Sequence, residues 1–485
     1  MGENVRIHLD NIGIIQDSQI KLNGLTVITG HNNSGKTTVG KTLYAILSAV
    51  ENIEKEANID MCSFAEVELD KIRNKFKYED NLLMGIWFEE KKALSEIDDL
   101  DFVKVFFNNR IDYQFQTTQT AIGFIEHLRR EVERISEADL NKILKNPKSV
   151  DKPKKGTRKK EQLLQSLENL IHSLGYDPEL IGYANKKIDG SLREEFNFQI
   201  LPVRKPHSVG KIEYWENDKQ CFNINIVEEG LFDLNKQVYY SKSFEDVTFV
   251  DDVFVIDKMY TTKMESESRR KGYNSYLWNP KEGVKWNDYS RSKSHQEDLL
   301  QKLTKQNKNL FEEIINEKKA NELFAKINSV FPEEIELGEG RYICSESKLD
   351  VKNLAAGSKM FAIIKKLVEN ALVNEGSLLI LDEPESHLHP EWQNKFAEII
   401  VLLVKELHPH VLLTTHSPNF LMALETYSKK YEIWEECVDV YCTEHVEDGY
   451  MVRYDYVKSN MTKAYAKLAN PLIAIKKIKM SVNDK

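Results

Sequence analysis

Residues 29–40 read TGHNNSGKTTVG and contain Gly30-x-x-x-x-Gly35-Lys36-Thr37, which is the spacing of a phosphate-binding loop. The two glycines let the backbone curl so that successive N–H groups point at a phosphate. We expect Lys36 to reach the β- and γ-phosphates and Thr37 to offer its hydroxyl to Mg²⁺. The residues of this stretch that are predicted to contact a nucleotide are Gly30, Asn32, Asn33, Ser34, Gly35, Lys36, Thr37 and Thr38.

A second group of chemically capable residues lies near the other end of the chain. The stretch 378–393 reads LLILDEPESHLHPEWQ, in which an apolar run ends in a carboxylate, as at the carboxyl end of a buried parallel strand. Asp382 is the expected partner of Mg²⁺, and Glu383 is placed to accept the proton of an attacking water. The alternative is a strand followed by an acidic turn, which the phosphate-binding loop disfavours.

A third stretch, VLLTTHSPNFL at 411–421, places His416 where an apolar strand ends. Such a histidine is most often an ordinary loop residue. Beside the other two motifs it is a candidate sensor of the γ-phosphate, because a neutral imidazole can donate a hydrogen bond to that phosphate. Between the phosphate-binding loop and the stretch 378–393, residues 351–368 read VKNLAAGSKMFAIIKKLV, a glycine-bearing turn that opens an amphipathic helix. The start of that helix is a further candidate for binding an anion.

Local patterns predict the elements that position the first motif. LTVIT at 25–29 is typical of a short buried strand, and KTTVGKTLYAILSAV at 36–50 is typical of a helix. The helix would direct its positive end at the bound phosphate. Together, the strand, the loop and the helix argue against a chance glycine-rich turn.

The order of these motifs resembles the ATP-binding-cassette (ABC) head shared by transporters, SMC and Rad50 proteins, RecF and the OLD nucleases. The resemblance covers residues 3–50 and 340–425. It implies an α/β fold, in which an ABC-type ATPase head of mixed sheet and helices carries a large, mostly helical insertion and a short α+β C-terminal extension. It also implies ATP and Mg²⁺ as ligands and ATP hydrolysis as the activity. The implied roles are phosphate binding and catalysis for Lys36, Mg²⁺ binding for Thr37 and Asp382, general-base catalysis for Glu383 and γ-phosphate sensing for His416.

In that superfamily two heads enclose the ATP, so the resemblance implies a homodimer or a higher homo-oligomer joined through the heads. The turn with Gly357 and Ser358 corresponds to the signature motif, which covers the γ-phosphate held by the opposing head. Residues 387–393 correspond to the loop that crosses the dimer interface. The signature usually carries a serine where this chain has Ala355, and one charge-assisted hydrogen bond contributes about 1.5–3 kcal/mol. Slow turnover, or a dimer held by other contacts, is therefore expected, unless Ser358 compensates.

The string DEPESHLHPEWQ followed by TTHSP resembles the OLD-like ATPases of bacterial anti-phage systems, among them the ATPase subunits of the Septu and PARIS systems. This implies an oligomeric sensor or switch that holds or activates a partner effector, expected to be a nuclease. The alternative is a RecF-like or Rad50-like DNA-repair ATPase that binds DNA directly. The net charge of −10 argues against a protein that coats nucleic acid, although it leaves local basic patches open.

The region between the two halves of the site is too long for a loop. Helices are predicted at 127–146, 161–175 and 294–331, and strands at 196–201, 221–227, 237–242 and 251–257. Residues 142–160 contain nine basic side chains and one acidic side chain. They form either the solvated tip of a helical hairpin or a contact with a nucleic-acid backbone or an acidic partner.

These patterns divide the chain into six predicted parts. They are an N-terminal head part with the loop at 1–60, a helical insertion at 61–195, strands completing the head at 196–262, a helical arm at 263–335, the C-terminal head part at 336–425 and an extension at 426–485. The extension is too short for the Toprim nuclease domain of OLD proteins, and so we expect the effector to be a separate protein.

Composition predicts a cytoplasmic protein with no membrane partner. The chain of 485 residues, with 41% hydrophobic and 30% charged side chains, contains no apolar run long enough to span a bilayer. Its first residues lack the apolar core of an export signal. The five cysteines form no C-x-x-C pair, which is typical of reduced thiols in the cytosol.

Overall fold

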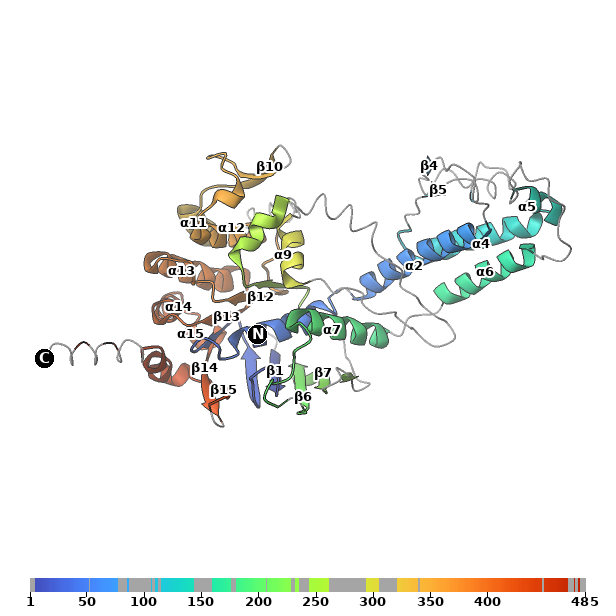
Figure 1. Cartoon of the computed structure of the whole chain (residues 1–485). Helices are drawn as coiled ribbons and strands as arrows, with labels where there is room; N and C mark the ends of the chain where they lie inside the picture. The colour runs from blue at the N-terminus through green and yellow to red at the C-terminus, as the bar shows by residue number, and fades with distance from the viewer. Residues whose placement is uncertain are drawn as a thin grey trace. The chain divides into compact units, whose positions relative to one another are not determined.

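In a computed structural model, the chain divides into two compact units (Figure 1). The first contains Met1–Glu51, Ala184–Gly272 and Arg291–Lys485, and the second contains Asn52–Tyr183 and Tyr273–Ser290. Within these bounds the structure describes residues 5–51, 53–76, 85–86, 106, 110–111, 115–143, 159–175, 180–205, 207–227, 232–234, 244–260, 294–304, 321–338, 341–446, 449–469, 475 and 479.

The first unit is built on a six-stranded sheet with the strand order β15-β14-β3-β13-β12-β9. All neighbouring pairs are parallel except β14 with β15. The inner strands are buried along nearly their whole length, as expected for a parallel sheet covered on both faces. The strands are β3 (Leu25–Thr29), β9 (Asp246–Val250), β12 (Ser377–Asp382), β13 (His410–Thr415), β14 (Val438–Val446) and β15 (Met451–Tyr456).

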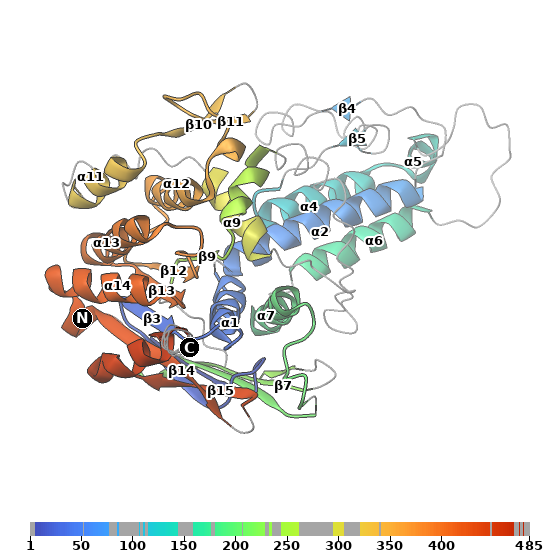
Figure 2. The same cartoon turned by 60° about the vertical axis from the view of Figure 1, so that its left-hand side comes forward.

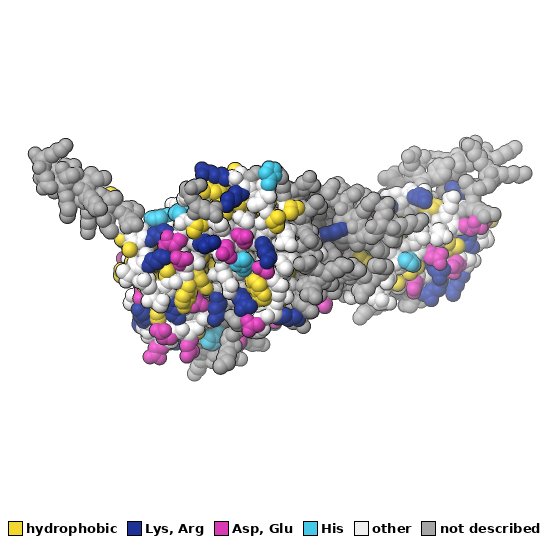
Figure 3. All heavy atoms as spheres, turned by 90° about the horizontal axis from the view of Figure 1, so that it is seen from below, with side chains coloured by type: hydrophobic (Ala, Val, Ile, Leu, Met, Phe, Trp, Pro, Cys, Tyr) yellow, Lys and Arg dark blue, Asp and Glu magenta, His cyan; other side chains and the backbone are white. Residues whose placement is uncertain are grey.

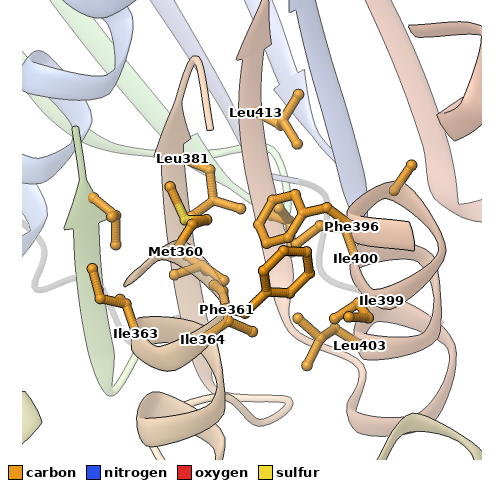
Figure 4. Packing of buried hydrophobic residues seen from close by; sticks show 14 of the residues in the cluster. Met360, Phe361, Ile363, Ile364, Leu381, Phe396, Ile399, Ile400, Leu403 and Leu413 are labelled. Carbon is orange, nitrogen blue, oxygen red and sulfur yellow. The ribbon is translucent and has the colours of Figure 1, made fainter. Parts of the chain in front are cut away.

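Helices cover the two faces of this sheet. On one face, α1 (Lys36–Ser48) packs so closely that a Cβ added at Gly40 would lie 3.0 Å from Cγ2 of Ile380. The next residue, Leu381, points to the opposite face, where Figure 4 shows it beside Phe361 and Phe396. Figure 2 shows α12 (Ala356–Glu369), α13 (Pro390–Leu407) and α14 (Pro418–Lys430) side by side on that face. Other helices of this unit are α7 (Leu180–Phe196, which begins in the second unit), α9 (His295–Thr304), α11 (Asn321–Val330), α15 (Trp434–Cys437) and the 3₁₀ helices η1 (Val253–Tyr260), η2 (Val351–Asn353) and η3 (Lys458–Asn460).

A second, antiparallel sheet has the order β2-β1-β6-β7-β8. Its β6–β7 hairpin turns through Asn217 and Asp218, both with positive φ, which is the backbone of a two-residue hairpin loop. The strands are β1 (Val5–Asp10), β2 (Ser18–Leu22), β6 (Gly210–Glu216), β7 (Lys219–Ile226) and β8 (Phe232–Leu234), and a separate hairpin contains β10 (Ile335–Gly338) and β11 (Arg341–Cys344). The mixed sheets and numerous helices confirm the predicted α/β class.

The second unit is mostly helical in its described residues. Its core contains apolar side chains that recur every three or four residues, for example Ala121, Ile125, Leu128 and Val132, as a helix with one buried face requires. The elements are α2 (Ile53–Phe76), β4 (Gly85–Ile86), β5 (Arg110–Ile111), α4 (Thr118–Arg134), α5 (Glu137–Ile143) and α6 (Lys159–Leu174).

The predicted elements of the helical region are partly confirmed. The helix at 161–175 corresponds to α6. The single helix at 127–146 is wrong, because Ile135 has extended backbone and Oγ of Ser136 accepts from N–H of Asp139 to begin α5. The two ends of the helix at 294–331 are helical as α9 and α11, and residues 305–320 lie outside the described residues.

Of the predicted strands, the one at 221–227 corresponds to β7. The strand at 196–201 is wrong, since α7 continues to Phe196 and the next two residues have positive φ. The strand at 251–257 is also wrong: β9 ends at Val250, and Oδ1 of Asp252 accepts from N–H of Phe254 at 2.8 Å to turn the chain into η1. The strand at 237–242 lies outside the described residues, as do residues 144–158 of the basic segment 142–160. No described helix is both long and apolar enough to cross a membrane.

Candidate nucleotide site

The glycine-containing loop joins the end of β3 to α1, as predicted. Gly35 has φ of +74°, and a Cβ there would lie 3.2 Å from side-chain atoms of Ile14, Ile15 and Tyr454, so only glycine fits without strain. A Cβ at Gly30 would overlap Oγ1 of Thr443. The loop is therefore held between residues 14–15 on one side and the strands β14 and β15 on the other. The sequence patterns did not predict these contacts.

Lys36 bends back over this loop. Its Nζ donates to the carbonyl oxygens of Gly30 at 3.2 Å and His31 at 2.7 Å, and lies 3.1 Å from Oε1 of Glu383. Only 4% of the lysine side chain is exposed. A buried ammonium whose partners are two carbonyls and one carboxylate places a fixed positive charge inside the loop, where phosphates of a nucleotide would bind.

The remaining loop residues have distinct surroundings. Ser34 is buried, and its Oγ donates to the carbonyl of His31 at 2.7 Å while its own carbonyl accepts from Oη of Tyr454 at 3.4 Å. Asn32 and Asn33 are exposed, and Asn33 has φ of +57°. Thr38 lies in the first turn of α1, where its N–H donates to the carbonyl of Gly35 at 3.0 Å.

The side chain of Asp382, the last residue of β12, meets the hydroxyl groups of Thr37 from α1 and Thr414 from β13. Oγ1 of Thr37 donates to Oδ2 of Asp382 at 2.6 Å, and Oγ1 of Thr414 donates to Oδ1 at 2.5 Å. Burial raises the pKa of Asp382, and these two hydrogen bonds oppose that rise. A hydroxyl and a carboxylate are the oxygen donors that Mg²⁺ prefers. The donor set therefore fits Mg²⁺, which Thr37 and Asp382 would hold and which would neutralise phosphate charge.

Glu383 follows Asp382 with φ of +46°, a left-handed backbone that costs a non-glycine residue energy and is often found at functional sites. Its N–H donates to Oγ1 of Thr414 at 3.0 Å and to the carbonyl of Thr414 at 3.2 Å. Its carboxylate lies between Lys36 and His416, with Oε2 3.1 Å from Nδ1 of His416. The side chain is about one quarter exposed, so water can reach this carboxylate.

A further carboxyl group, Glu385, fixes the ends of β12 and β13 to each other. Its Oε1 accepts from Oγ1 of Thr415 at 2.5 Å and from N–H of His416 at 3.2 Å. Only 1% of its side chain is exposed, and burial raises its pKa. Glu385, Thr414 and Thr415 were not among the residues predicted from the sequence. Glu385 belongs to the quoted DEPE string, but nothing in the string distinguishes a buried carboxyl group from an acidic turn.

The signature turn lies at the start of α12, and the structure does not bring it to the loop. Ala355 is exposed and precedes α12 without a capping side chain. A Cβ at Gly357 would lie 3.2 Å from Leu388 and 3.3 Å from the carbonyl of His387, so this glycine allows α12 to approach residues 387–388. Within the described residues, no hydrogen bond or ion pair joins Gly357 or Ser358 to residues 30–37.

Comparison with known proteins gives a family for this chain and several solved structures to which it is similar. A sequence model of the family described as AAA ATPase domain matches residues 5–421, which include every residue that the sequence predicted for the site. Among solved structures, the SMC head domain from Thermotoga maritima is 11% identical, with a TM-score of 0.34 and coverage of 94% of this chain and 99% of that chain. The Smc head domain with an extended coiled coil, bound to the C-terminal domain of ScpA and derived from Pyrococcus furiosus, is 10% identical, with a TM-score of 0.37 and 99% of each chain covered.

Proposed function

The chain belongs to the AAA ATPase domain family, and on this premise we propose that it binds ATP with Mg²⁺ and hydrolyses the ATP at the site described above. The observation that carries the proposal is the convergence of Lys36 and Thr37 with Asp382, Glu383 and His416 at one edge of the parallel sheet. Thr37 and Asp382 are 345 positions apart in sequence, yet their side-chain oxygens lie 2.6 Å from each other. The carboxyl ends of β3, β12 and β13 meet at this edge, as in other open α/β sheets that bind ligands.

In the proposed reaction, backbone N–H groups of the loop and the ammonium of Lys36 hold the phosphates. Glu383 accepts a proton from water as the water oxygen forms a bond to the γ-phosphorus. The bond between that phosphorus and the bridging oxygen breaks, and ADP and phosphate are released. His416 lies beside the same carboxylate and orients it, and the imidazole can also contact the terminal phosphate.

The test is phosphate release by the Glu383→Gln variant. The amide keeps the size of the side chain but cannot accept the proton, so we expect the rate to fall about 100-fold or more while ATP binding persists. Glu391→Gln is the matched control, because Glu391 is an exposed carboxylate in the first turn of α13 and pairs with Lys395 at 2.9 Å. Hydrolysis at the wild-type rate by Glu383→Gln would refute the proposed role of this residue.

At a finer level, we propose that this ATPase is an oligomeric switch in a bacterial anti-phage complex, where it holds or activates a separate effector, a nuclease. The resemblance of DEPESHLHPEWQ to OLD-like defence ATPases supports this. A surface that contains His387 and Phe254 also supports self-association through the heads: Phe254 is 43% exposed, and the centroid of its ring lies 5.5 Å from that of His387. The packing of Gly357 on residues 387–388 makes the signature turn part of the same surface.

Light scattering on the chain expressed with its chromosomal neighbours tests this finer proposal. We expect an ATP-dependent oligomer that retains a neighbouring protein, with retention changed in Glu383→Gln. A chain that stays alone and binds duplex DNA with a steep salt dependence would instead support the RecF-like alternative, with the segment 142–160 as the proposed contact. On the face shown in Figure 3, basic and acidic side chains of the described residues are interspersed.

A further inference from the structure

A buried histidine at the start of α9 lies between two carboxylates. Nδ1 of His295 is 2.6 Å from Oε2 of Glu195, and Nε2 is 2.9 Å from Oδ2 of Asp251. The N–H of His295 also donates to Oε1 of Glu195 at 2.9 Å. Burial lowers the pKa of His295, but the two carboxylates outweigh burial and raise that pKa to about 9. The ring is therefore an imidazolium whose two N–H groups each face an anion.

One of these anions lies at the edge of the nucleotide site. Asp251 directly follows β9, and β9 pairs in parallel with β12 so that Val250 lies opposite Leu381. Asp251 and Asp382, the last residue of β12, each follow this last pair by one residue. Burial is the main cause that raises the pKa of Asp382, and the negative charges of Glu383 and Asp251 add to it. Asp251 thus contributes to the electrostatic field in which Asp382 would bind a metal.

The histidine is held rigidly on its other sides. Its ring packs on Phe249 of β9 at 4.5 Å between centroids and meets Tyr44 of α1 edge-on at 5.9 Å. The carbonyl of Glu195, in the last turn of α7, accepts from Nζ of Lys41 of α1 at 3.0 Å. α1, which carries Lys36 and Thr37, and β9, which pairs with β12, therefore fix the position of the imidazolium.

We propose that His295 is a positioning residue for the metal–nucleotide site. It holds Asp251 beside Asp382 and thereby sets how much negative charge a bound Mg²⁺ experiences. This inference rests on the proposed binding of ATP and Mg²⁺. The competing explanation is an ion pair that only fastens α9 to α7 and β9. Both explanations predict a loss of stability when His295 is replaced, but only the first predicts a change in metal binding whose sign follows the charge removed.

The same helix offers a matched control. Lys302 of α9 is as buried as His295, and its Nζ lies 3.1 Å from Asp246 and 2.9 Å from Asp298. Asp246 is the first residue of β9, at the opposite end of the strand from Asp251. Replacing Lys302 therefore removes a buried cation from α9 without changing the charge at the edge that carries Asp382.

The experiment uses the full chain and the variants His295→Gln, Asp251→Asn, the double variant and Lys302→Met. The measurement is the Mg²⁺ concentration that gives half-maximal binding of a fluorescent, non-hydrolysable ATP analogue, together with the thermal midpoint. His295→Gln removes a positive charge and should lower that concentration, and Asp251→Asn removes a negative charge and should raise it, each about three- to tenfold. In the double variant the two changes should cancel to within about twofold. Lys302→Met should lower the thermal midpoint and leave the Mg²⁺ concentration unchanged.

Shifts of the same sign in the two single variants, or no shift in either, would overturn the inference and leave the cluster as a fastening ion pair. If His295→Gln does not fold, the nearly isosteric Asp251→Asn decides alone, because an unchanged Mg²⁺ concentration in that variant refutes the proposal. A wild-type chain that binds the analogue but never releases phosphate from ATP refutes the proposed hydrolysis and leaves this titration valid. A wild-type chain that does not bind the analogue overturns both proposals.

Discussion

Replacing Thr414 by valine should impair hydrolysis through the loss of one hydroxyl. Thr414 is fully buried in β13, and its Oγ1 donates to Asp382 at 2.5 Å and accepts from N–H of Glu383 at 3.0 Å. Valine keeps the β-branched shape that suits a strand, so the substitution leaves no cavity. After it, Asp382 retains the hydrogen bond from Thr37, and the N–H of Glu383 retains the carbonyl of Thr414 at 3.2 Å.

The size of the effect follows from the charged acceptor. A hydrogen bond to an ionised group contributes about 1.5–3 kcal/mol, and the free energy of unfolding should fall by about that amount. If the same hydrogen bond holds Asp382 and Glu383 in their reactive geometry, the rate of phosphate release should fall about 10- to 150-fold, because about 1.4 kcal/mol corresponds to a factor of ten. Steady-state phosphate release and denaturant unfolding measure the two quantities on the same preparation.

Thr26→Val is the matched control. Thr26 is also fully buried in the parallel sheet, and its Oγ1 donates to the carbonyl of Lys21 at 3.0 Å and accepts from N–H of Asn23 at 3.2 Å. It lies near the start of β3, away from the carboxyl edge, and its neutral hydrogen bond contributes about 0.5–1.5 kcal/mol. We expect lower stability and a rate within about twofold of wild type. Equal rates in Thr414→Val and Thr26→Val would refute the role assigned to the Thr414 hydroxyl.

Three further predictions concern the loop, the surface of the head and the effect of pH. Gly35→Ala places a Cβ at φ of +74° and 3.2 Å from three side chains, and should abolish ATP binding in a fluorescence titration; unchanged affinity would show that the loop tolerates this Cβ without strain. Gly357→Val pushes α12 away from residues 387–388 and should prevent ATP-dependent self-association in light scattering, while ATP affinity persists. Burial raises the pKa of Glu51 from 4.5 to about 7, so its stabilising contribution is complete below 4.5 and is lost as the pH rises through 7. Glu51→Gln should therefore raise the thermal midpoint above pH 7 and leave it nearly unchanged near pH 5, and a wild-type midpoint that does not vary over this range would exclude the effect.

The parts of the site that sequence could predict are those specified by local spacing. The strand at 25–29, the left-handed glycine at 35 and the helix that begins at Lys36 are adjacent in the chain, so turn and helix rules suffice to predict them. The apolar run before Asp382 and the one before His416 are equally local. Their meeting at one edge depends on strand order, which those patterns do not contain and which the resemblance to known heads supplied.

The predictions that failed did so where a turn, a cap or a neighbouring helix overrides the apolar pattern. The alternation at 251–257 resembles a strand, but the residues that pair with β12 are 246–250, and the side chain of Asp252 turns the chain immediately afterwards. The alternation at 196–201 lies where α7 continues to Phe196. His295 and Glu195 are 100 positions apart, and no periodicity relates two residues at that separation. Such pairs can be found only once the fold has brought them together.

The helix α1 connects the phosphate-binding loop to the buried ion pairs around His295. Its first turn carries Lys36 and Thr37 at the site, and Lys41, in its second turn, donates to the carbonyl of Glu195. Because a helix is stiff over so few residues, a shift of the loop on nucleotide binding moves Lys41 as well. Glu195 in turn holds His295, which holds Asp251 at the same edge as Asp382. The loop and Asp382, the proposed metal ligand, are therefore linked by two routes, one through the direct hydrogen bond from Thr37 to Asp382 and one through this buried chain of charges. Removing a member of the second route should change metal binding even though the direct hydrogen bond is intact.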